Sequence, residues 1–150
     1  MITKNITLLF LIFILTNCGF SPIYQKNIDV DFSIQNINYE GDRELNNFLR
    51  TNLNQYKNEK NINKIDIEVN SIYEKIIFSK NRSGDITNYQ LKAEVIFLIK
   101  PLNKEIKITE KRLMNIMDDK FEEAKYERSI KQNFASSIAN KLSSELIVNK

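Results

Sequence analysis

Side chains that could carry out covalent or acid–base chemistry are few in this 150-residue sequence. It contains no histidine, the commonest general base and metal ligand in enzymes. Its three glycines cannot build a phosphate-cradling loop, and the carboxylate pair Asp118 and Asp119 is better suited to starting a helix. The sequence therefore predicts a protein that is not an enzyme and holds no metal or other cofactor. The one reactive side chain that stands out is the thiol of Cys18, the only cysteine.

The segment before Cys18 has the composition of a secretory signal peptide. Lys4 supplies a positive charge ahead of an apolar run over residues 6–15, and Cys18 follows directly. The run is too short to span a bilayer as a helix, which takes roughly 20 apolar residues. Residues 1–17 are therefore expected to be a leader that is removed.

The end of this leader resembles a bacterial lipobox. The residues are Leu15-Thr16-Asn17-Cys18, and Asn17 stands where the pattern usually has Gly or Ala. The resemblance implies cleavage before Cys18, diacylglycerol on its thiol and an amide-linked acyl chain on its amino group. Two or more acyl chains hold a protein firmly on a bilayer. The alternative is a free or buried thiol beside an uncleaved anchor.

The residues that follow make the resemblance more specific. Residues 18–24, CGFSPIY, resemble the C-G-F-x-P-L-Y start of the lipopolysaccharide-assembly lipoprotein (LptE) family. That resemblance implies an outer-membrane lipoprotein that plugs an LptD-type β-barrel from the periplasmic side, within the barrel lumen. It would help to assemble the barrel and assist insertion of lipopolysaccharide. Gly19, in place of the aspartate that commonly retains lipoproteins at the inner membrane, fits this location. The alternative is a lipid-anchored periplasmic scaffold or binding domain with a different envelope partner.

The rest of the composition predicts one domain without a nucleic-acid partner. The formal net charge is +3, too small for a nucleic-acid-binding face. No intramolecular disulfide can form with one cysteine, so an apolar core must hold the fold. We expect a lipidated tether over residues 18–27 and a single LptE-like domain over residues 28–150.

Hydrophobic periodicity predicts two strands and a helix in the first half of this domain. Alternation predicts a strand over 30–39, with a one-residue slip before Ile37 that indicates a bulge. Apolar residues at helical spacing predict a helix from Asp42, its N-cap, to about Tyr56. After a polar loop, a second strand over 65–78 is expected to change register near Ser71.

The second half is expected to contain two more strands and a long helix. A turn over 79–85 leads to a strand over 89–99, in which Ile96 and Leu98 interrupt the polar face and predict that this end is covered. An irregular strand over 106–117 follows, and the helix over 120–147 places Ala124, Ile130, Phe134, Ala135, Ile138, Ala139, Leu142 and Leu146 on one stripe.

The predicted fold class is α+β, in the order β-α-β-β-β-α. Two helices would pack on one face of a four-stranded, mostly antiparallel sheet, giving a two-layer sandwich. Short connections predict a meander of the last three strands, and the helix after the first strand allows a parallel neighbour. The LptE resemblance implies the same order of elements.

Four cations are the candidate ligand-binding residues. Lys80 and Arg82 lie in the turn after the second strand, and Lys111 and Arg112 lie near the end of the fourth, which the topology places at the same edge. Arg binds phosphate through two parallel hydrogen bonds and Lys as a point charge. With the family resemblance, this predicts a site for lipopolysaccharide phosphates. The alternative is that these are ordinary solvated charges.

Overall fold

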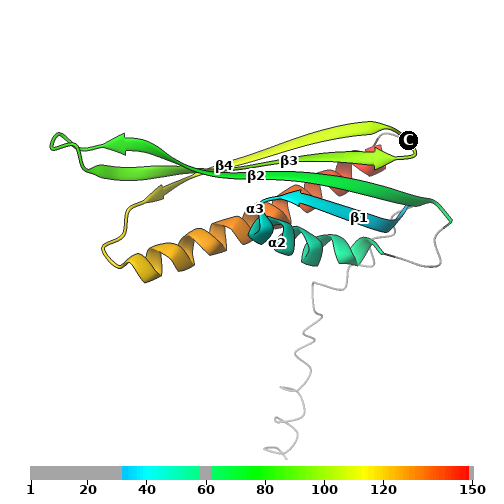
Figure 1. Ribbon diagram of the computed structural model, residues 1–150, viewed down its shortest axis with the longest axis horizontal. Coiled ribbons are helices and arrows are strands. Elements are labelled where there is room, and N and C mark those ends of the chain that lie inside the picture. The colour runs from blue at the N-terminus through cyan, green and yellow to red at the C-terminus, as the bar shows by residue number, and fades with distance from the viewer. Residues whose placement is uncertain (1–31, 58–61, 149–150) are drawn as a thin grey trace, which may run out of the picture.

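The computed structural model describes residues 32–57 and 62–148. The signal peptide, Cys18, the tether over 18–27 and the start of the expected domain lie outside the described residues. The elements are β1 (Ser33–Gly41), α2 (Arg43–Leu53), a 3-10 turn (Asn54–Tyr56), β2 (Lys64–Lys80), β3 (Ile86–Lys100), β4 (Lys104–Asn115) and α3 (Lys120–Val148). Both helices lie on one face of the sheet (Figure 1), so the predicted α+β class and element order are confirmed.

The sheet has the strand order β1-β2-β3-β4 and is mixed. β1 pairs in parallel with β2, as the intervening helix allowed, while β2, β3 and β4 form the predicted antiparallel meander. The bulge in β1 is also confirmed, since pairing steps from Ile34 directly to Asn36. The start of β1 therefore lies at the end of the sheet opposite the turn between β2 and β3.

The core lies between the sheet and the two helices. Its fully buried side chains include Leu45, Leu49 and Leu53 from α2 and Ile67 and Val69 from β2. β3 contributes every second residue from Leu91 to Ile99, all of them 0% exposed. Burying apolar side chains in this way is the main favourable term for a chain of this size.

Helix α2 begins as the sequence predicted. The carboxylate of Asp42 accepts a hydrogen bond from the backbone N–H of Leu45 at 2.7 Å, which satisfies one of the unpaired donors of the first turn. The apolar stripe of α3 begins later than predicted: Ala124 is exposed, and Ile130 is its first buried apolar residue. The earlier inward position is held by the carboxylate of Glu123.

The predicted register change near Ser71 is wrong. Ser71 continues the buried face of β2 and is 1% exposed. Its hydroxyl donates to the carbonyl oxygen of Glu40, at 3.3 Å, and lies 3.4 Å from that of Asp42. A polar residue thus occupies a core position because the turn between β1 and α2 satisfies it. The irregular pairing lies further along, between Ile77 and Lys80.

The outer face of the sheet also differs from the prediction. Ile96 and Leu98 are half-buried there, but among the described residues no helix or strand lies over them. On the neighbouring strand, Lys107 lies opposite Ile96 and Glu105 lies opposite Leu98. Long polar side chains can cover apolar surface with their stems.

Gly41 is the position where the backbone most depends on glycine. Its φ is +95°, and a Cβ there would lie 1.8 Å from the carbonyl oxygen of Ser71. Gly84 has a similar φ of +93°, but nothing lies within 4 Å of its Cβ position.

We therefore expect Gly41→Ala to lower the free energy of unfolding by more than Gly84→Ala. Backbone strain costs roughly 1–3 kcal/mol at either site, and the clash with Ser71 adds to it only at Gly41. Urea titration followed by circular dichroism measures both changes. Equal effects of the two substitutions would contradict the close approach of β1 to β2.

Candidate functional site at the hairpin end of the sheet

The turn between β2 and β3 lies beyond the start of α3 at one end of the molecule (Figure 1). Asn81 organises it: its backbone N–H donates to the carbonyl oxygen of Asp85 at 2.8 Å, and its side-chain oxygen accepts from the backbone N–H of Asp85 at 2.9 Å. Gly84, at positive φ, donates its N–H to Asn81. The turn is thus ordered by its own hydrogen bonds, and it presents Lys80 and Arg82 to solvent.

Lys111 and Arg112 lie at the same end but do not converge with the turn. The end of β4 is near the turn, since Asn115 pairs with Asn88, yet Lys111 pairs with Lys92 and Arg112 with Leu91. Consecutive strand residues point to opposite faces. Arg112 therefore shares the helix-covered face with Leu91, and Lys111 lies on the outer face. All four predicted cations are exposed, and no ion pair links any of them to a carboxylate within the described ranges.

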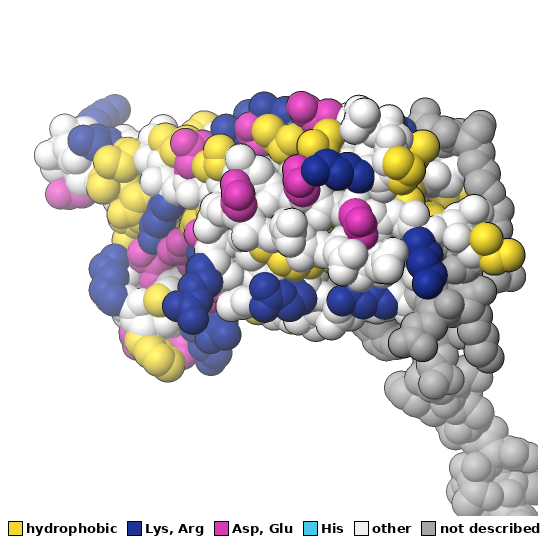
Figure 2. Space-filling model, turned by 45° about the vertical axis from the view of Figure 1, so that its right-hand side comes forward, with side chains coloured by type: hydrophobic (Ala, Val, Ile, Leu, Met, Phe, Trp, Pro, Cys, Tyr) yellow, Lys and Arg dark blue, Asp and Glu magenta, His cyan; other side chains and the backbone are white. Residues whose placement is uncertain are grey.

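Sequence reasoning missed the apolar side chains that accompany these cations. Ile76, Ile77, Phe78 and Leu113 are between 45% and 56% exposed. Figure 2 shows hydrophobic and basic side chains close together at this end of the molecule. The available signal was the pair Ile72 and Ile76, which lie on the face of β2 opposite to its buried residues. The sequence does not reveal that this outer face is left uncovered by the described elements.

A polar network beneath the hairpin ties β2 to α3. The ammonium group of Lys75 lies 3.2 Å from the Glu123 carboxylate and 2.9 Å from that of Glu127, and it sits 4.4 Å from the centre of the Tyr89 ring. The Tyr73 hydroxyl donates to Glu127 at 2.9 Å. Burial, with the adjacent Glu127 carboxylate, raises the pKa of Tyr73, so its phenol stays protonated as a donor.

The network continues to the start of α2. Lys131 is 8% exposed, and its ammonium group lies 2.8 Å from the carboxylate of Glu44 and 4.0 Å from the centre of the Tyr73 ring. Arg128 contacts the same carboxylate at 3.3 Å. Because both helices and β2 contribute, the network fixes the angle at which the hairpin leaves the helix layer.

Glu123 anchors the connection between β4 and α3. Its carboxylate accepts from the backbone N–H of Met117 at 3.1 Å and from Lys120 at 3.0 Å, besides its contact with Lys75. The hydrogen bond from Met117, supported by those from Lys120 and Lys75, lowers the pKa of Glu123 to about 2. The carboxylate is therefore ionised throughout the physiological range.

Two hollows elsewhere on the surface lack the combination of unpaired cations and exposed apolar side chains found at the hairpin end. One, of about 690 Å³, runs between β4 and the second half of α3 and is lined by residues 104–109 with polar residues of the helix such as Ser137 and Asn140. The other, of about 370 Å³, lies on the outer face beside Ile96 and Leu98. Within residues 32–57 and 62–148, no cluster of three or more His, Cys, Asp or Glu side chains could hold a metal ion.

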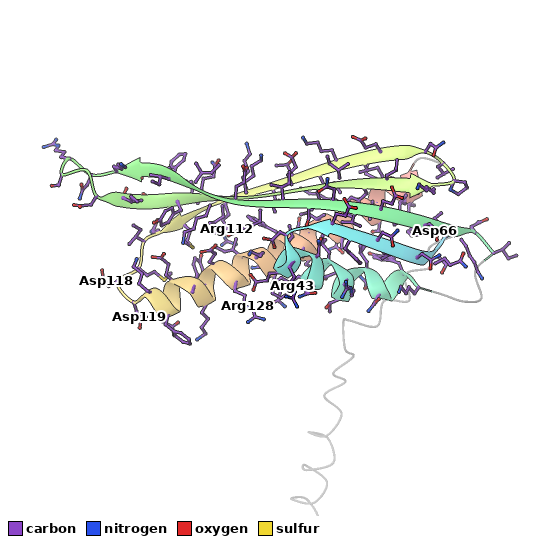
Figure 3. The ribbon with its side chains drawn as sticks, viewed as in Figure 1. Arg43, Asp66, Arg112, Asp118, Asp119 and Arg128 are labelled. Atoms are coloured by element: carbon purple, nitrogen blue, oxygen red, sulfur yellow. The ribbon has the colours of Figure 1, made fainter. Side chains whose placement is uncertain are left out.

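The carboxylates of Asp118 and Asp119 lie where the chain enters α3 (Figure 3). Asp119 accepts from the backbone N–H of Phe121 at 2.8 Å and from that of Glu122 at 3.3 Å. It therefore caps the helix, as the sequence predicted. None of the helices in the described part of the chain is both long and apolar enough to cross a membrane.

Comparison with known proteins gives a likeness of fold. No family model matches the sequence, and no curated protein matches it. Among solved structures, rare lipoprotein B from Shewanella oneidensis matches with a TM-score of 0.55 at 14% identity, over 75% of this chain and 93% of that one. An uncharacterized lipoprotein B from Nitrosomonas europaea matches with a TM-score of 0.54 at 16% identity, over 79% and 86%. A minor lipoprotein from Acinetobacter baumannii gives 0.50 at 15%, over 73% and 93%. This chain therefore shares its fold with proteins described as lipoproteins.

We expect Glu123→Gln to destabilise the fold at neutral pH by about 1–3 kcal/mol, the usual cost of weakening a charged hydrogen-bond acceptor that is itself buried. The pKa of Glu123 is lowered from 4.5 to about 2, so its contribution is complete above pH 4.5 and is lost as the pH falls through 2. The difference in unfolding free energy between wild type and variant should shrink over that range.

The matched control is Glu122→Gln, which removes an exposed carboxylate whose contact with Lys125 is 3.5 Å. It should change stability by less than about 0.5 kcal/mol at any pH. A pH-independent effect of Glu123→Gln would show that its carboxylate charge does not hold the network.

Proposed function

We propose that this protein is an outer-membrane lipoprotein of the lipopolysaccharide transport and assembly machinery, with no catalytic activity of its own. The observation that carries the proposal is the CGFSPIY sequence at residues 18–24, placed directly after the apolar leader. The fold adds support, since the solved structures it resembles include rare lipoprotein B.

Acylation of Cys18 is the first part of the proposed function. Diacylglycerol on its thiol and a further acyl chain on its amino group would fix the protein to the membrane. Residues 18–27, which include polar and turn-forming residues, would be the tether between the anchor and the domain. In this proposal the anchor sets the location, and the domain supplies the binding surfaces.

Recognition of lipopolysaccharide phosphates is the second part. The tip cations Lys80 and Arg82 are separated in the chain by Asn81 alone, face solvent and have no ion-pair partner among the described residues. They are therefore free to accept phosphate without first breaking a salt bridge. Lys111 and Arg112 lie further from the turn, on opposite faces of the sheet. In this proposal they add positive charge on the two sides of the tip and do not form one pocket with it.

The third part of the proposed function is that the domain sits in the polar interior of a membrane barrel. The outer sheet face carries paired charges: Lys92 lies 3.1 Å from Glu74, Lys107 lies 2.6 Å from Glu94, and Lys100 lies 2.6 Å from Glu68. Barrel lumens are polar, and a surface of neutralised ion pairs fits such a wall. The proposed partner is an LptD-type outer-membrane barrel that the domain plugs and helps to assemble.

Charge reversal at the tip tests the phosphate-binding part. We expect Lys80→Glu combined with Arg82→Glu to weaken binding of phosphorylated lipid A by at least about tenfold, because two charge-assisted contacts are replaced by repulsion. Binding can be measured by surface plasmon resonance on immobilised lipid A.

The control pair is Lys57→Glu with Lys64→Glu, two exposed lysines at the opposite end of the sheet. It changes the net charge equally and should leave binding within about twofold, because a uniform charge effect is largely screened at physiological salt. Equal losses from both pairs would remove the tip from the proposed function.

A further inference from the structure

The hairpin end presents a surface whose apolar part the phosphate contacts do not explain. We name it the distal surface, and it consists of Ile76, Phe78, Lys80, Arg82, Lys111 and Leu113. Its three apolar members are 45%, 56% and 50% exposed in the order of their numbers. Single exposed apolar residues are common, but several gathered on one small area mark an interaction site.

Strand register places the apolar members on the outer face together. Ile76 and Leu113 both pair with Gln90, so they flank it in one row across three strands. Lys111 is two residues from Leu113 and points the same way. Phe78 lies where the pairing of β2 with β3 becomes irregular, next to the turn. The row therefore continues from the outer face towards the tip.

The charge of this surface is positive. Lys80, Arg82 and Lys111 are exposed and form no ion pair with any described residue. Of the nearby acids, Glu74 is neutralised by Lys92 at 3.1 Å, while Asp85 accepts only from the uncharged side chain of Asn81 at 3.0 Å and keeps its charge. The three cations outnumber this one remaining acid. An occupant must therefore offer negative charge beside an apolar region.

We propose that the distal surface docks on an anionic phospholipid leaflet. Ile76, Phe78 and Leu113 enter the boundary of the acyl chains, and the long cationic side chains reach the phosphates above them. The charge complementarity between three unpaired cations and anionic headgroups carries this assignment. The surface projects and lies outside the hollows between β4 and α3 and beside Ile96, so a fluid leaflet that moulds around it fits better than a rigid partner.

The position of the distal surface makes it a second membrane contact, remote from the amino-terminal tether. β2 has 17 residues, about 55 Å of strand, between the end where β1 begins and the turn. The 15 residues from Cys18 to Ser33 span at most ~50 Å. A chain that is held at Cys18 and not yet enclosed by the barrel can therefore reach the same leaflet with its far end. The contact itself does not depend on acylation.

Tryptophan fluorescence can test the contact, because the chain contains no native tryptophan. The full chain with Phe78→Trp is reconstituted into vesicles of phosphatidylethanolamine and phosphatidylglycerol that contain lipids brominated along the acyl chain. We expect a blue shift and strong quenching of the vesicle-bound fraction. Tyr126→Trp, on the exposed side of α3, is the matched control and should show neither.

Two additional arms define the chemistry. Replacing phosphatidylglycerol by phosphatidylcholine should lower the partitioning reported by Phe78→Trp quenching by roughly a hundredfold, since each of the three cations contributes about fivefold near an anionic surface. Ile76→Ser with Leu113→Ser in the same background should reduce it by roughly tenfold. Both residues are half-exposed, and an unchanged urea midpoint confirms that the fold is kept.

Absence of quenching with Phe78→Trp in the anionic vesicles would overturn the proposal. Quenching that appears only when lipopolysaccharide is added would also overturn it, and would leave the proposed function standing. Quenching in anionic vesicles without binding of lipid A would support the membrane contact while contradicting the phosphate-binding part of the proposed function. The two ideas can therefore fail separately.

Discussion

The long antiparallel pairing of β2 with β3 is the constraint on which the rest of the structure depends. It runs from Asp66 opposite Lys100 to Lys80 opposite Ile86, and it spans more of the molecule than the helix layer does (Figure 1). Where helices cover the sheet, alternate residues of these strands form the core. On the opposite, outer face, the alternate residues Ile76 and Leu113 are left exposed to solvent. One pairing therefore produces both the stable body and the exposed end that carries the candidate site.

A polar network fixes the orientation of the extended hairpin end relative to the helices. It consists of Lys75, Glu123, Glu127, Tyr73 and Lys131. The hairpin end of β2 and β3 extends past the helices, so its orientation must be fixed where it leaves them. Fixing it by apolar packing would require longer helices. α3 instead directs Glu123 and Glu127 at β2 before its apolar stripe begins. Buried ion pairs add little net stability compared with apolar packing, but they fix geometry because a misplaced charge is costly. The network thereby sets where the hairpin end points.

The sequence predicted the architecture because periodicity and caps are local signals. The Asp42 cap, the bulge in β1 and the start of α3 at Lys120 were all readable from the pattern of side chains. Predictions failed where tertiary contacts override that pattern: Ser71 occupies a core position because the turn at Gly41 satisfies its hydroxyl. The edge that joins the four cations could be predicted from topology, and strand alternation already places Lys111 and Arg112 on opposite faces. Their distance from the turn depends on register, which pairs them with Lys92 and Leu91. The apolar part of the distal surface could not be predicted, since no local signal says which face stays uncovered.

The central claim is that an acylated residue 18 holds this domain at the outer membrane, where it plugs a barrel partner. Native mass spectrometry of the protein purified from detergent-solubilised envelopes tests it most directly. The account predicts a complex of one large barrel protein with one copy of residues 18–150, whose first residue carries diacylglycerol and an amide-linked acyl chain. A chain that retains residues 1–17, or an unmodified Cys18, would contradict the anchor. An acylated chain bound to a different envelope protein would contradict the barrel and favour a scaffold role.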